Sequence, residues 1–556
     1  MQNKLRTKLS LLVLLLLFCN GESFQALSAE EIVSIASKHL PPSELIEALV
    51  GKGEFEGYVM QETFWEAKRQ LQAKYSDFIG EDIFVGQSFE NRQLKGFFVG
   101  RDVHNLKKQS EKAIVLLDSA HHAREAIGLQ LILTVMLQEL SSLVKGGDSS
   151  RVYDTVSIFF YPVVNPDGFA QIKKPGFREK RKNMRITGTC MQPQDEGVDI
   201  NRNYDIVFDR FGEMTSNPCT DEFKGSGPFS EPETQAVRNI FDKFPSVRSA
   251  LNFHSYGNIW IMPYNFNRPG DVGMDKLQPE LFKLYEHFKM QKVLPPHASV
   301  GSAFDTIQYY TSGEASDWMS VVKGVFVWSP ELGPDGTAVG DGFSTTPELQ
   351  RAIVRDQLPA VTAFVQLHRP NISVTHVEWQ EDAHEIVLNL ENIGYGDIYN
   401  VSVQFQTEES ESIKSIKLFM PGNQPTSQIH RMSQNASLLI SCFPAAFPRL
   451  KTRQVSISIF SHTSLVSRLN LLGNSVGITP VSDVLATETG RHIERGLFAF
   501  VAVVVIFVFG MLITVKCLRG KGHAESSSQS DWEETNTNVT VTTNEMGYFK
   551  TNVDQI

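Results

Sequence analysis

Two stretches of unbroken apolar character place the strongest constraint on the fold of this chain. "KAIVLLDSA" (112–120) and "TVSIFFYPVV" (155–164) lack the polar alternation of a strand that has one face in water. Strands buried on both faces occur mainly where helices cover both sides of a parallel or mixed sheet. An amphipathic helix is predicted between them, over residues 126–144. The pattern therefore indicates an α/β layer structure.

Helical and strand signals alternate over residues 55–368, and the character of the sequence changes after Pro370. Residues 371–475 contain short alternating stretches separated by Gly, Asn and Pro, which predict a small antiparallel β-sandwich. A chain of 556 residues is too long for one compact core, so a second folded unit is expected. Residues 476–496 are expected to form a stalk, and the polar segment 516–556 is expected to be a disordered tail.

Hydrophobic segments lie near both ends of the chain. Residues 1–23 combine a basic flank with a short apolar core, as a secretory signal peptide does. Residues 497–515 carry no charge and have about the 20-residue length that a membrane-spanning helix needs. Basic residues follow that run at once, which places the following segment in the cytosol and disfavours the alternative of a buried core helix. We therefore predict a single-pass type I membrane protein with its bulk at the cell surface or in the lumen of a vesicle.

The charge and the short acceptor motifs agree with that placement. The net charge of −11 and the lack of a concentrated basic run argue against a nucleic-acid partner. On the predicted outer side, N-glycosylation sequons begin at Asn371, Asn400 and Asn435. Cys190 and Cys219 lie on the same side, where they could close a loop of about thirty residues.

The segment "LLDSAHHAREAIG" (116–128) crowds polar side chains directly after an apolar strand. His122 and Glu125 stand three residues apart, so both can turn toward one point from a tight bend. Nitrogen and oxygen ligands, with a fourth position left to water, are typical of catalytic zinc. His254 also follows an apolar strand, and in α/β sheets sites form at the carboxyl ends of strands. Taken singly, a polar surface turn and a core histidine remain the alternatives.

Several separated motifs resemble those of the zinc metallocarboxypeptidases of the carboxypeptidase A and B type, and they occur in that family's order. The resemblance covers roughly residues 55–368. The motifs are "HARE" (122–125), "NPDGF" (165–169), "RKN" (181–183), "GVDINRNY" (197–204), "GPFSEPET" (227–234), "NFHSY" (252–256), "YYTSGEASDW" (309–318) and "FVWSPEL" (326–332). The resemblance implies a three-layer α/β/α sandwich with a mixed central sheet, and one Zn²⁺ per chain.

The same resemblance implies a role for individual residues. The zinc ligands would be His122, Glu125 and His254; the catalytic residues would be Glu331 and Arg181; the substrate contacts would be Arg124, Asn201, Arg202, Tyr256 and Tyr309. Counting back from Asp317 selects Tyr309 over Tyr310 as the mobile tyrosine. Cys190 and Cys219 stand where the pancreatic-type enzymes have a disulfide.

The implied chemistry is complete. A planar guanidinium such as that of Arg202 binds a terminal carboxylate with two parallel hydrogen bonds. Zinc lowers the pKa of a bound water, and Glu331 can take that proton and pass it to the leaving amine. Zinc and Arg181 would stabilise the charge that develops on the carbonyl oxygen. The sequence therefore predicts an enzyme that releases single amino acids from the carboxyl ends of peptides or proteins.

The preferred terminal residue stays open. Ser316 occupies the position that is apolar in A-type and acidic in B-type enzymes, and Asn265 occupies a second pocket position. Neither residue is apolar or charged, although Glu314 would favour Lys or Arg if it turned inward. The segment ahead of the catalytic domain is too short for the folded inhibitory prodomain of the pancreatic enzymes.

Two other functions fit parts of the sequence. A catalytically silent binding or adhesion protein could keep the fold, but it predicts loss of a ligand, of Glu331 or of Arg181, and all of these are present. A cytosolic tail-processing carboxypeptidase is disfavoured by the signal peptide and the sequons.

Overall fold

The computed structural model describes residues 26–369, apart from 209–214 and 335–341, and beyond residue 371 the backbone of strands β9 to β20. The predicted signal peptide and membrane-spanning helix lie outside the described residues, as does the predicted stalk beyond Thr479. Asn371 and Asn400 also lie outside them, and Asn435 begins β15.

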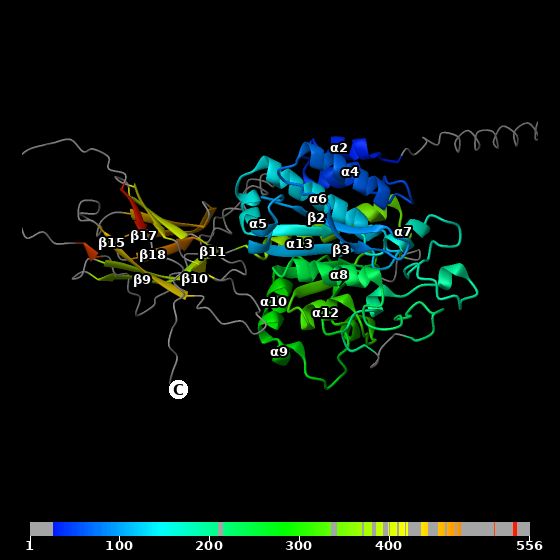
Figure 1. The fold of residues 1–556 in the computed structure, drawn as a ribbon. Helices are drawn as coiled ribbons and strands as arrows, with labels where there is room; N and C mark the ends of the chain where they lie inside the picture. The colour runs from blue at the N-terminus through cyan, green and yellow to red at the C-terminus, as the bar shows by residue number, and fades with distance from the viewer. Residues whose placement is uncertain are drawn as a thin grey trace, which may run out of the picture.

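Within the described residues, the centre of the catalytic region is one mixed sheet of eight strands (Figure 1). In order across the sheet these are β1 (Ile83–Gln87), β2 (Gln93–Val99), β4 (Val156–Tyr161), β3 (Ala113–Ser119), β5 (Val247–Phe253), β8 (Phe326–Glu331), β6 (Ile259–Ile261) and β7 (Ser299–Gly301). The inner strands β4, β3, β5 and β8 are parallel, whereas β2 pairs with β4, and β6 with β8, in antiparallel fashion. The prediction of a mixed sheet is confirmed.

Successive side chains of β3 enter two different cores, which is why this strand is apolar throughout. Val115 and Leu117 belong to the larger core, and Ile114 and Leu116 to the smaller one. Helices cover both faces of the sheet, with α2, α4 and α6 above it and α8 and α12 below it in Figure 1. The central sheet therefore lies between two helical layers, as the resemblance implied.

The helices that contribute to the larger core are α2 (Ala29–Ala36), α3 (Pro42–Leu49), α4 (Gln61–Lys74), α6 (Ile127–Lys145), α10 (Pro279–Met290) and α13 (Pro347–Gln366). Those of the smaller core are α8 (Pro232–Lys243) and α12 (Ala315–Val321). Short helices complete the region: α5 (Leu106–Glu111), η1 (Asp148–Asp154), α7 (Pro166–Gln171), η2 (Pro193–Asp195), η3 (Ile200–Arg202), α9 (Met274–Leu277) and α11 (Ala303–Ile307).

Helix α6 carries apolar residues on nearly all of its faces. Of the helices in the described residues, it alone is long and apolar enough to cross a membrane, and 83% of its most apolar window is buried inside the protein. A helix that is hydrophobic all round can serve as the core of a large domain. Its burial under α3 and α13 and over β3 identifies α6 as such a core helix.

The N-terminal helices belong to the same folded unit as the sheet. Ser28 caps α2 through a reciprocal pair of hydrogen bonds with Glu31, at 3.3 Å and 2.8 Å. Ile32 of α2 and Leu49 of α3 are fully buried in the larger core. These two short helices, which precede the predicted domain boundary at residue 55, therefore complete a core that is built mostly from other segments.

Beyond residue 371 the described backbone is made of strands. They are β9 (Ile372–Gln380), β10 (Glu385–Asn392), β11 (Ile398–Tyr399), β12 (Val401–Thr407), β13 (Glu411–Ile416), β14 (Phe419–Met420), β15 (Asn435–Cys442), β16 (Gln454–Ser461), β17 (Ser464–Leu472), β18 (Ser475–Thr479), β19 (Lys516–Cys517) and β20 (Thr537–Val541). From β9 to β18 each described pairing is antiparallel, as the alternating sequence predicts. Their packing as a β-sandwich stays a prediction.

Two short strands fall in the segment that was predicted to be a disordered tail. β19 pairs in parallel with β15, and β20 pairs in parallel with β13. β20 has the sequence TNVTV, whose β-branched residues favour an extended backbone even in a polar segment. The low apolar content of the whole tail conceals this local preference.

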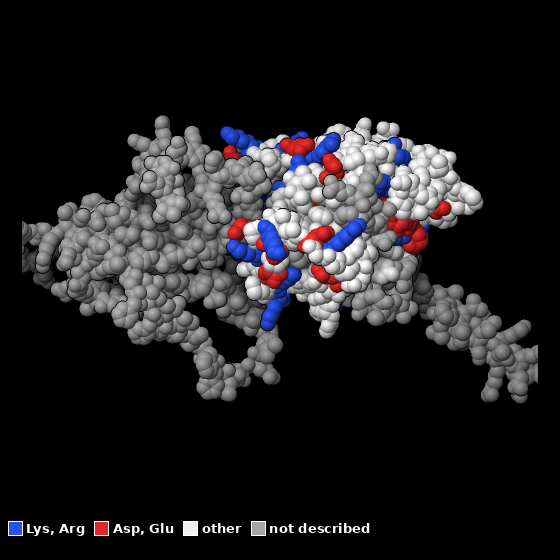
Figure 2. Space-filling view, turned by 90° about the horizontal axis from the view of Figure 1, so that it is seen from below, with Lys and Arg blue, Asp and Glu red and all other residues white. Residues whose placement is uncertain are grey.

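On the face shown in Figure 2, Lys and Arg lie beside Asp and Glu instead of forming a patch of one sign. Lys283 pairs with Glu280, and Lys289 pairs with Glu286, both along α10. Such a mixed surface does not resemble a phosphate-binding face.

Candidate metal centre and substrate site

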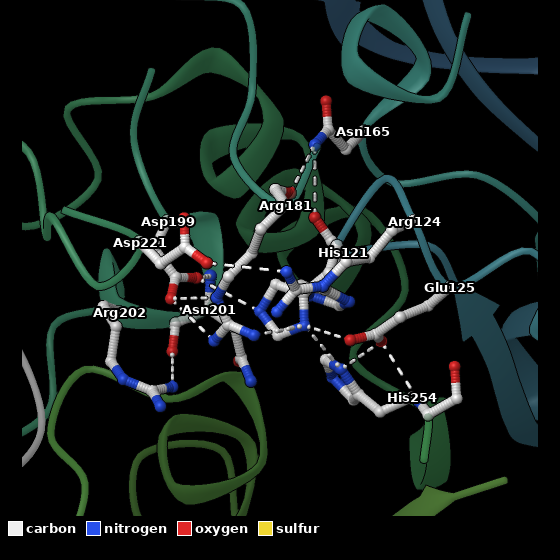
Figure 3. Close-up of polar contacts among 12 residues, drawn as sticks. His121, Arg124, Glu125, Asn165, Arg181, Asp199, Asn201, Arg202, Asp221 and His254 are labelled. Atoms are coloured by element: carbon white, nitrogen blue, oxygen red, sulfur yellow. Dashed lines mark hydrogen bonds and ion pairs between the residues drawn. The ribbon is translucent and has the colours of Figure 1, made fainter. Parts of the chain in front are cut away.

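The carboxyl ends of β3 and β5 bring His122, Glu125 and His254 together (Figure 3). His122 and Glu125 lie in the short connection from β3 to α6, and His254 directly follows β5. His122 Nδ1 lies 2.8 Å from Glu125 Oε1, and His254 Nδ1 lies 3.0 Å from Glu125 Oε2. The two Nδ1 atoms are 3.2 Å apart, so both rings direct the same nitrogen to one point.

All three side chains are buried, and their candidate ligand atoms lie within 4.8 Å of one another. Burial raises the pKa of Glu125, but the histidines beside it and their hydrogen bonds outweigh this effect and lower the pKa overall. Burial likewise lowers the pKa of His254, against the opposing charge of Glu125. An ionised carboxylate and a neutral imidazole are the states in which these residue types bind a metal ion.

Asp199 connects the histidine cluster to an arginine. Its Oδ1 lies 3.2 Å from His122 Nε2, and its Oδ2 accepts hydrogen bonds from Arg181 Nε (3.0 Å) and Nη2 (2.8 Å). Burial raises the pKa of Asp199, but the charges of Arg181 and His122 hold it well below its ordinary value. Arg181 Nη1 in turn lies 3.2 Å from His122 Nδ1, so the guanidinium borders the point where the ligand atoms converge.

Asn165 holds the loops that carry these groups. Its Oδ1 caps α7 at Gly168 N (3.0 Å), and its Nδ2 donates to the carbonyl oxygens of His121 (3.3 Å) and Arg181 (3.5 Å). A Cβ at Gly168 would lie 2.8 Å from the Lys182 carbonyl oxygen, so a larger residue would push the two loops apart. The "NPDGF" motif thus positions the metal-ligand loop against the arginine segment.

Asn201 and Arg202 lie in η3, and the Arg202 side chain lies away from the histidines in Figure 3. Asp199 Oδ1 also accepts from Asn201 N (2.9 Å), which fixes the start of this turn. Asn201 Oδ1 accepts from Ala315 N (3.0 Å), and Arg202 Nη1 donates to the Asn201 carbonyl oxygen (2.8 Å). Arg202 is nearly fully buried, a position in which a guanidinium pairs strongly with an anion.

Glu331 ends β8, next to the end of β5. Its backbone forms a bridge with that of His254, so the sheet itself places this carboxyl beside the ligand cluster. Burial and the charge of Glu125 raise the pKa of Glu331 well above its ordinary value, against the opposing effect of Arg181. A raised pKa makes this carboxyl a better proton acceptor than an ordinary glutamate, as suits a group that accepts a proton and returns it.

The two neighbouring tyrosines of the "YYTSGEASDW" motif have different surroundings. Tyr310 stacks on Phe304, with ring centres 4.7 Å apart. Burial raises the pKa of Tyr309, and the charges of Arg202, Glu314, Glu331 and Arg181 all act on it. Tyr309 is therefore the tyrosine that lies among the charged groups of the site.

Two predicted substrate contacts lie at the rim. Arg124 Nη1 donates to the Glu179 carbonyl oxygen (3.3 Å) and lies 3.5 Å from Asp221, and its guanidinium packs over the Phe343 ring. Tyr256 is 38% exposed and also packs against Phe343, with ring centres 5.0 Å apart. Both side chains are therefore held by the rim and not by the ligand cluster.

Asn265 and Ser316 lie together, as predicted, and they share a third neighbour. Asn265 Nδ2 donates to Glu314 Oε2 (2.7 Å) and lies 3.3 Å from Ser316 Oγ. All three side chains are buried. The charged residue of this pocket is therefore Glu314 and not either of the two positions chosen by register.

Cys190 and Cys219 form a disulfide, with Cα atoms 5.3 Å apart, as the resemblance implied. The bond closes the segment that contains Asp199, Asn201 and Arg202. Asp199 was not predicted to be a functional residue. The sequence nevertheless contained a clue to it. Metal-bound histidines commonly donate a hydrogen bond from their second ring nitrogen to a carboxylate, and Asp199 lies within the "GVDINRNY" motif.

Comparison with known proteins covers the same region. The pattern of the zinc carboxypeptidase family matches residues 66–359. Carboxypeptidase B of Astacus astacus is 29% identical over 254 residues, which span 45% of this chain and 78% of that protein. Carboxypeptidase O of Bos taurus is 27% identical over 300 residues, which span 53% of this chain and 75% of that protein.

Among solved structures, that of thrombin activatable fibrinolysis inhibitor superposes with a TM-score of 0.48 at 21% identity, and the match spans 61% of this chain and 80% of that one. The family pattern spans every motif from "HARE" to "FVWSPEL" and more than half of the 556 residues. The chain therefore belongs to the zinc carboxypeptidase family, and it is a metallocarboxypeptidase that uses Zn²⁺.

Proposed function

We propose that this protein removes single amino acids from the carboxyl ends of peptides or proteins outside the cytosol. One observation carries the proposal: His122, Glu125 and His254 converge beside two arginines, the buried Arg202 and Arg181, whose side chain is 13% exposed. A metal centre alone would fit many hydrolases. The additional buried cation at Arg202 fits a substrate that ends in a carboxylate.

The residues present fit a catalytic zinc ion. Two histidine nitrogens and one carboxylate make the three-ligand set of catalytic zinc sites, which leave a further position to water. His122, Glu125 and His254 would hold the ion. When bound, zinc supplies a water of lowered pKa and polarises the scissile carbonyl.

The protein side chains supply binding and proton transfer. Arg202 and Asn201 hold the terminal carboxylate, which places the last peptide bond near Arg181. Arg181, kept charged by Asp199 and Glu125 in spite of burial, donates to the carbonyl oxygen as negative charge develops there. Glu331 accepts a proton from the attacking water and delivers it to the leaving amine. Tyr309 covers the bound terminus.

The experiment is release of the terminal amino acid from a peptide panel by the full-length protein, with and without a chelator, beside a Glu331→Gln variant. We expect the chelator to abolish release and the substitution to reduce kcat by at least roughly 100-fold, since Glu331 handles the proton. Asp242→Asn, an exposed change near Lys323, is the control and should behave as wild type. Zinc content measured on the same samples should be one ion per chain.

The second candidate, a catalytically silent binding protein, predicts a different result. Such a protein would bind zinc at full stoichiometry and yet release no amino acid from any peptide, and Glu331→Gln would change nothing. Release that depends on both zinc and Glu331 would exclude it.

We further propose that residues 497–515 anchor the protein in a membrane, with a cleaved signal at residues 1–23 and glycans at Asn371, Asn400 and Asn435. The length and apolarity of that run and its basic flank support the anchor. The pairing of β20 with β13 corresponds to a different arrangement, because a spanning helix between them would place these strands on opposite sides of the membrane.

A tag at the C-terminus decides between the two arrangements. In intact cells that carry the protein at their surface, the anchor predicts that the tag resists added protease until detergent is present, whereas residues 371–475 are glycosylated on the outer side. A tag that is digested without detergent would refute the anchor and agree with the strand pairing.

A further inference from the structure

One carboxylate in the pocket beside Arg202 has no part in the mechanism above. Glu314 precedes α12, and its side chain retains 12% of its exposure. Its Oε1 lies 3.3 Å from Arg202 Nη1, and its Oε2 accepts a 2.7 Å hydrogen bond from Asn265 Nδ2 and lies 3.5 Å from Ser316 Oγ. The pocket is therefore acidic, although both of its predicted specificity positions are neutral.

The backbone prevents Glu314 from turning away. Gly313 donates to the Ile206 carbonyl oxygen and accepts from Tyr204 N, both at 3.0 Å. Its φ is +70°, and a Cβ there would lie 2.2 Å from the Arg202 carbonyl oxygen. Ala315 N donates to Asn201 Oδ1 on the other side of Glu314 (3.0 Å). Glu314 is thus held between two residues that are bonded to the segment of Arg202.

The orientation of the Asn265 amide follows from a second contact. Asn265 Oδ1 accepts from Ala303 N (2.8 Å), so its Nδ2 is the group that points to Glu314. Asn265 N donates to both oxygens of Asp317, at 2.9 Å and 3.1 Å, which holds this residue in place. The amide therefore presents a donor to the Glu314 side chain and holds it in place.

The surrounding charged groups are Arg202, Asp317 and, toward the reaction centre, Glu331 and Arg181. Burial raises the pKa of Asp317 well above its ordinary value, and the charge of Glu314 raises it further. The pKa of Glu331, raised first by burial and by Glu125, is also raised by Glu314. The Glu314 carboxylate is thus close enough to act on both the pocket and the reaction centre.

We propose that this pocket pairs Glu314 with the cationic side chain of a C-terminal lysine or arginine. The proposal rests on the proposed function, in which Arg202 binds the terminal carboxylate. Arg202 then serves two anions, and a basic side chain in the pocket supplies the second cation. An apolar side chain would leave the carboxylate buried against carbon, and an acidic one would add repulsion.

The first test uses substrates that differ only in charge. Peptides ending in arginine or in citrulline have nearly the same shape, and peptides ending in lysine or in norleucine form a second pair. For the full-length wild type we expect kcat/KM to be roughly 100-fold higher for the charged member of each pair, since hydrogen bonds to charged groups are the strong ones. Equal rates within both pairs, or faster release of leucine or glutamate, would overturn the proposal.

The second test alters the pocket. Glu314→Gln keeps the shape and should reduce the arginine-to-citrulline ratio to about 1, whereas Glu314→Asp should retain part of it, with roughly 10-fold discrimination. Glu280→Gln makes the same charge change on exposed α10 and should leave the ratio as in wild type. If Glu314→Gln instead accelerates every substrate equally, Glu314 merely competes for Arg202, and the proposal is wrong. Thermal unfolding of each variant establishes that it is folded.

Failure of the proposed function would look different. If peptides ending in citrulline are cleaved as fast as peptides ending in arginine, the protein is a carboxypeptidase, but the proposed role of Glu314 is wrong. If no peptide is cleaved, the melting temperature of the zinc-loaded protein in free L-arginine against L-citrulline still tests the pocket. A larger rise with arginine that Glu314→Gln abolishes supports the assignment in a protein without the proposed activity, and equal rises overturn it.

Discussion

Two buried clusters in this domain each contain a carboxyl, and the pKa values of these two carboxyls are shifted in opposite directions. Asp199 lies between His122 and Arg181, and its pKa is held well below the ordinary range. Glu233 lies beside Asn183, and burial raises its pKa to about 7. Asp199 has the largely buried guanidinium of Arg181 as donor, whereas the donors to Glu233 are neutral and include the amide of Asn183 at 3.1 Å and the Phe89 N–H at 3.3 Å. Burial turns a carboxyl into a proton-holding group unless a cation is buried with it.

The two clusters also do different work on one segment. Asn183 donates to Glu231 (2.8 Å) and Glu233, and its Oδ1 accepts from Val198 N (2.8 Å), so this cluster holds the backbone. Two residues earlier, Arg181 extends to Asp199 and the metal ligands. The cluster of Asn183 thus fixes the backbone, and Asp199 fixes the side chain of Arg181 that the segment presents.

The largest expected difference between the clusters is in how the unfolding free energy depends on pH, to which Glu233 should contribute. Because the folded pKa of Glu233 is about 7 and the ordinary value is 4.5, its contribution is complete below pH 4.5 and is lost as pH rises through 7. That loss corresponds to about 3 kcal/mol of unfolding free energy. The Glu233→Gln variant lacks this titrating group. The unfolding free energies of wild type and variant, measured by urea unfolding and plotted against pH, should therefore differ in slope between pH 4.5 and 7.

The control for that comparison is Glu280→Gln, on an exposed face of α10. Its curve should run parallel to that of wild type, since the buried histidines titrate equally in both proteins. A Glu233→Gln curve that is also parallel would show that Glu233 is ionised in the folded protein, and the contrast with Asp199 would disappear.

Next in size is the effect of removing the charge of Asp199. Asp199→Asn keeps the shape but gives His122 and Arg181 a neutral neighbour, and we expect zinc affinity to fall roughly 10- to 100-fold, with activity falling in parallel. Competition with a chelator measures the affinity. The matched control, Asp242→Asn, removes an exposed partner of Lys323 and should retain wild-type affinity. Unchanged zinc binding in Asp199→Asn would reduce Asp199 to a packing residue.

The smallest expected effect on stability is at the exposed N-terminal cap of α2, which contains the carboxylate of Glu31. Glu31 and Ser28 cap α2 at the surface, and Ser28→Ala should lower the unfolding free energy by about 1 kcal/mol without changing its pH dependence between 4.5 and 7. Ser28→Asp preserves the cap and should retain stability. If Ser28→Ala has no effect, the N-terminal helices contribute less to the core than the burial of Ile32 and Leu49 indicates.

Many helices and strands were predictable because the pattern of apolar residues that indicates each one lies within a single stretch of sequence. The apolar runs that became β3 and β4, and the helical spacing that became α4 and α6, each lie within one stretch of chain. The helices α2 and α3 precede the predicted boundary at residue 55, where the family resemblance begins. Their membership depends on partners in α4, α6 and α13 that no local pattern reveals.

Within the site, ordered motifs identified the residues, and strand ends brought them together. His122 and His254 are 132 positions apart, and the parallel pairing of β3 with β5 places them side by side. Neither the motifs nor the strand ends predict the role of Asp199 or the inward position of the Glu314 side chain. Each depends on hydrogen bonds between loops, such as those of Gly313 with residues near Arg202, which leave no periodic trace in the sequence.

By itself, the sequence determined the α/β architecture, the zinc carboxypeptidase family and the residue types available for catalysis. The spacing of apolar residues and the order of the motifs are properties of the sequence alone. Only the tertiary structure decided which of those carboxyls hold charge and which hold protons. That outcome depends on whether a guanidinium or a neutral amide is buried against each one, and therefore on contacts between distant segments.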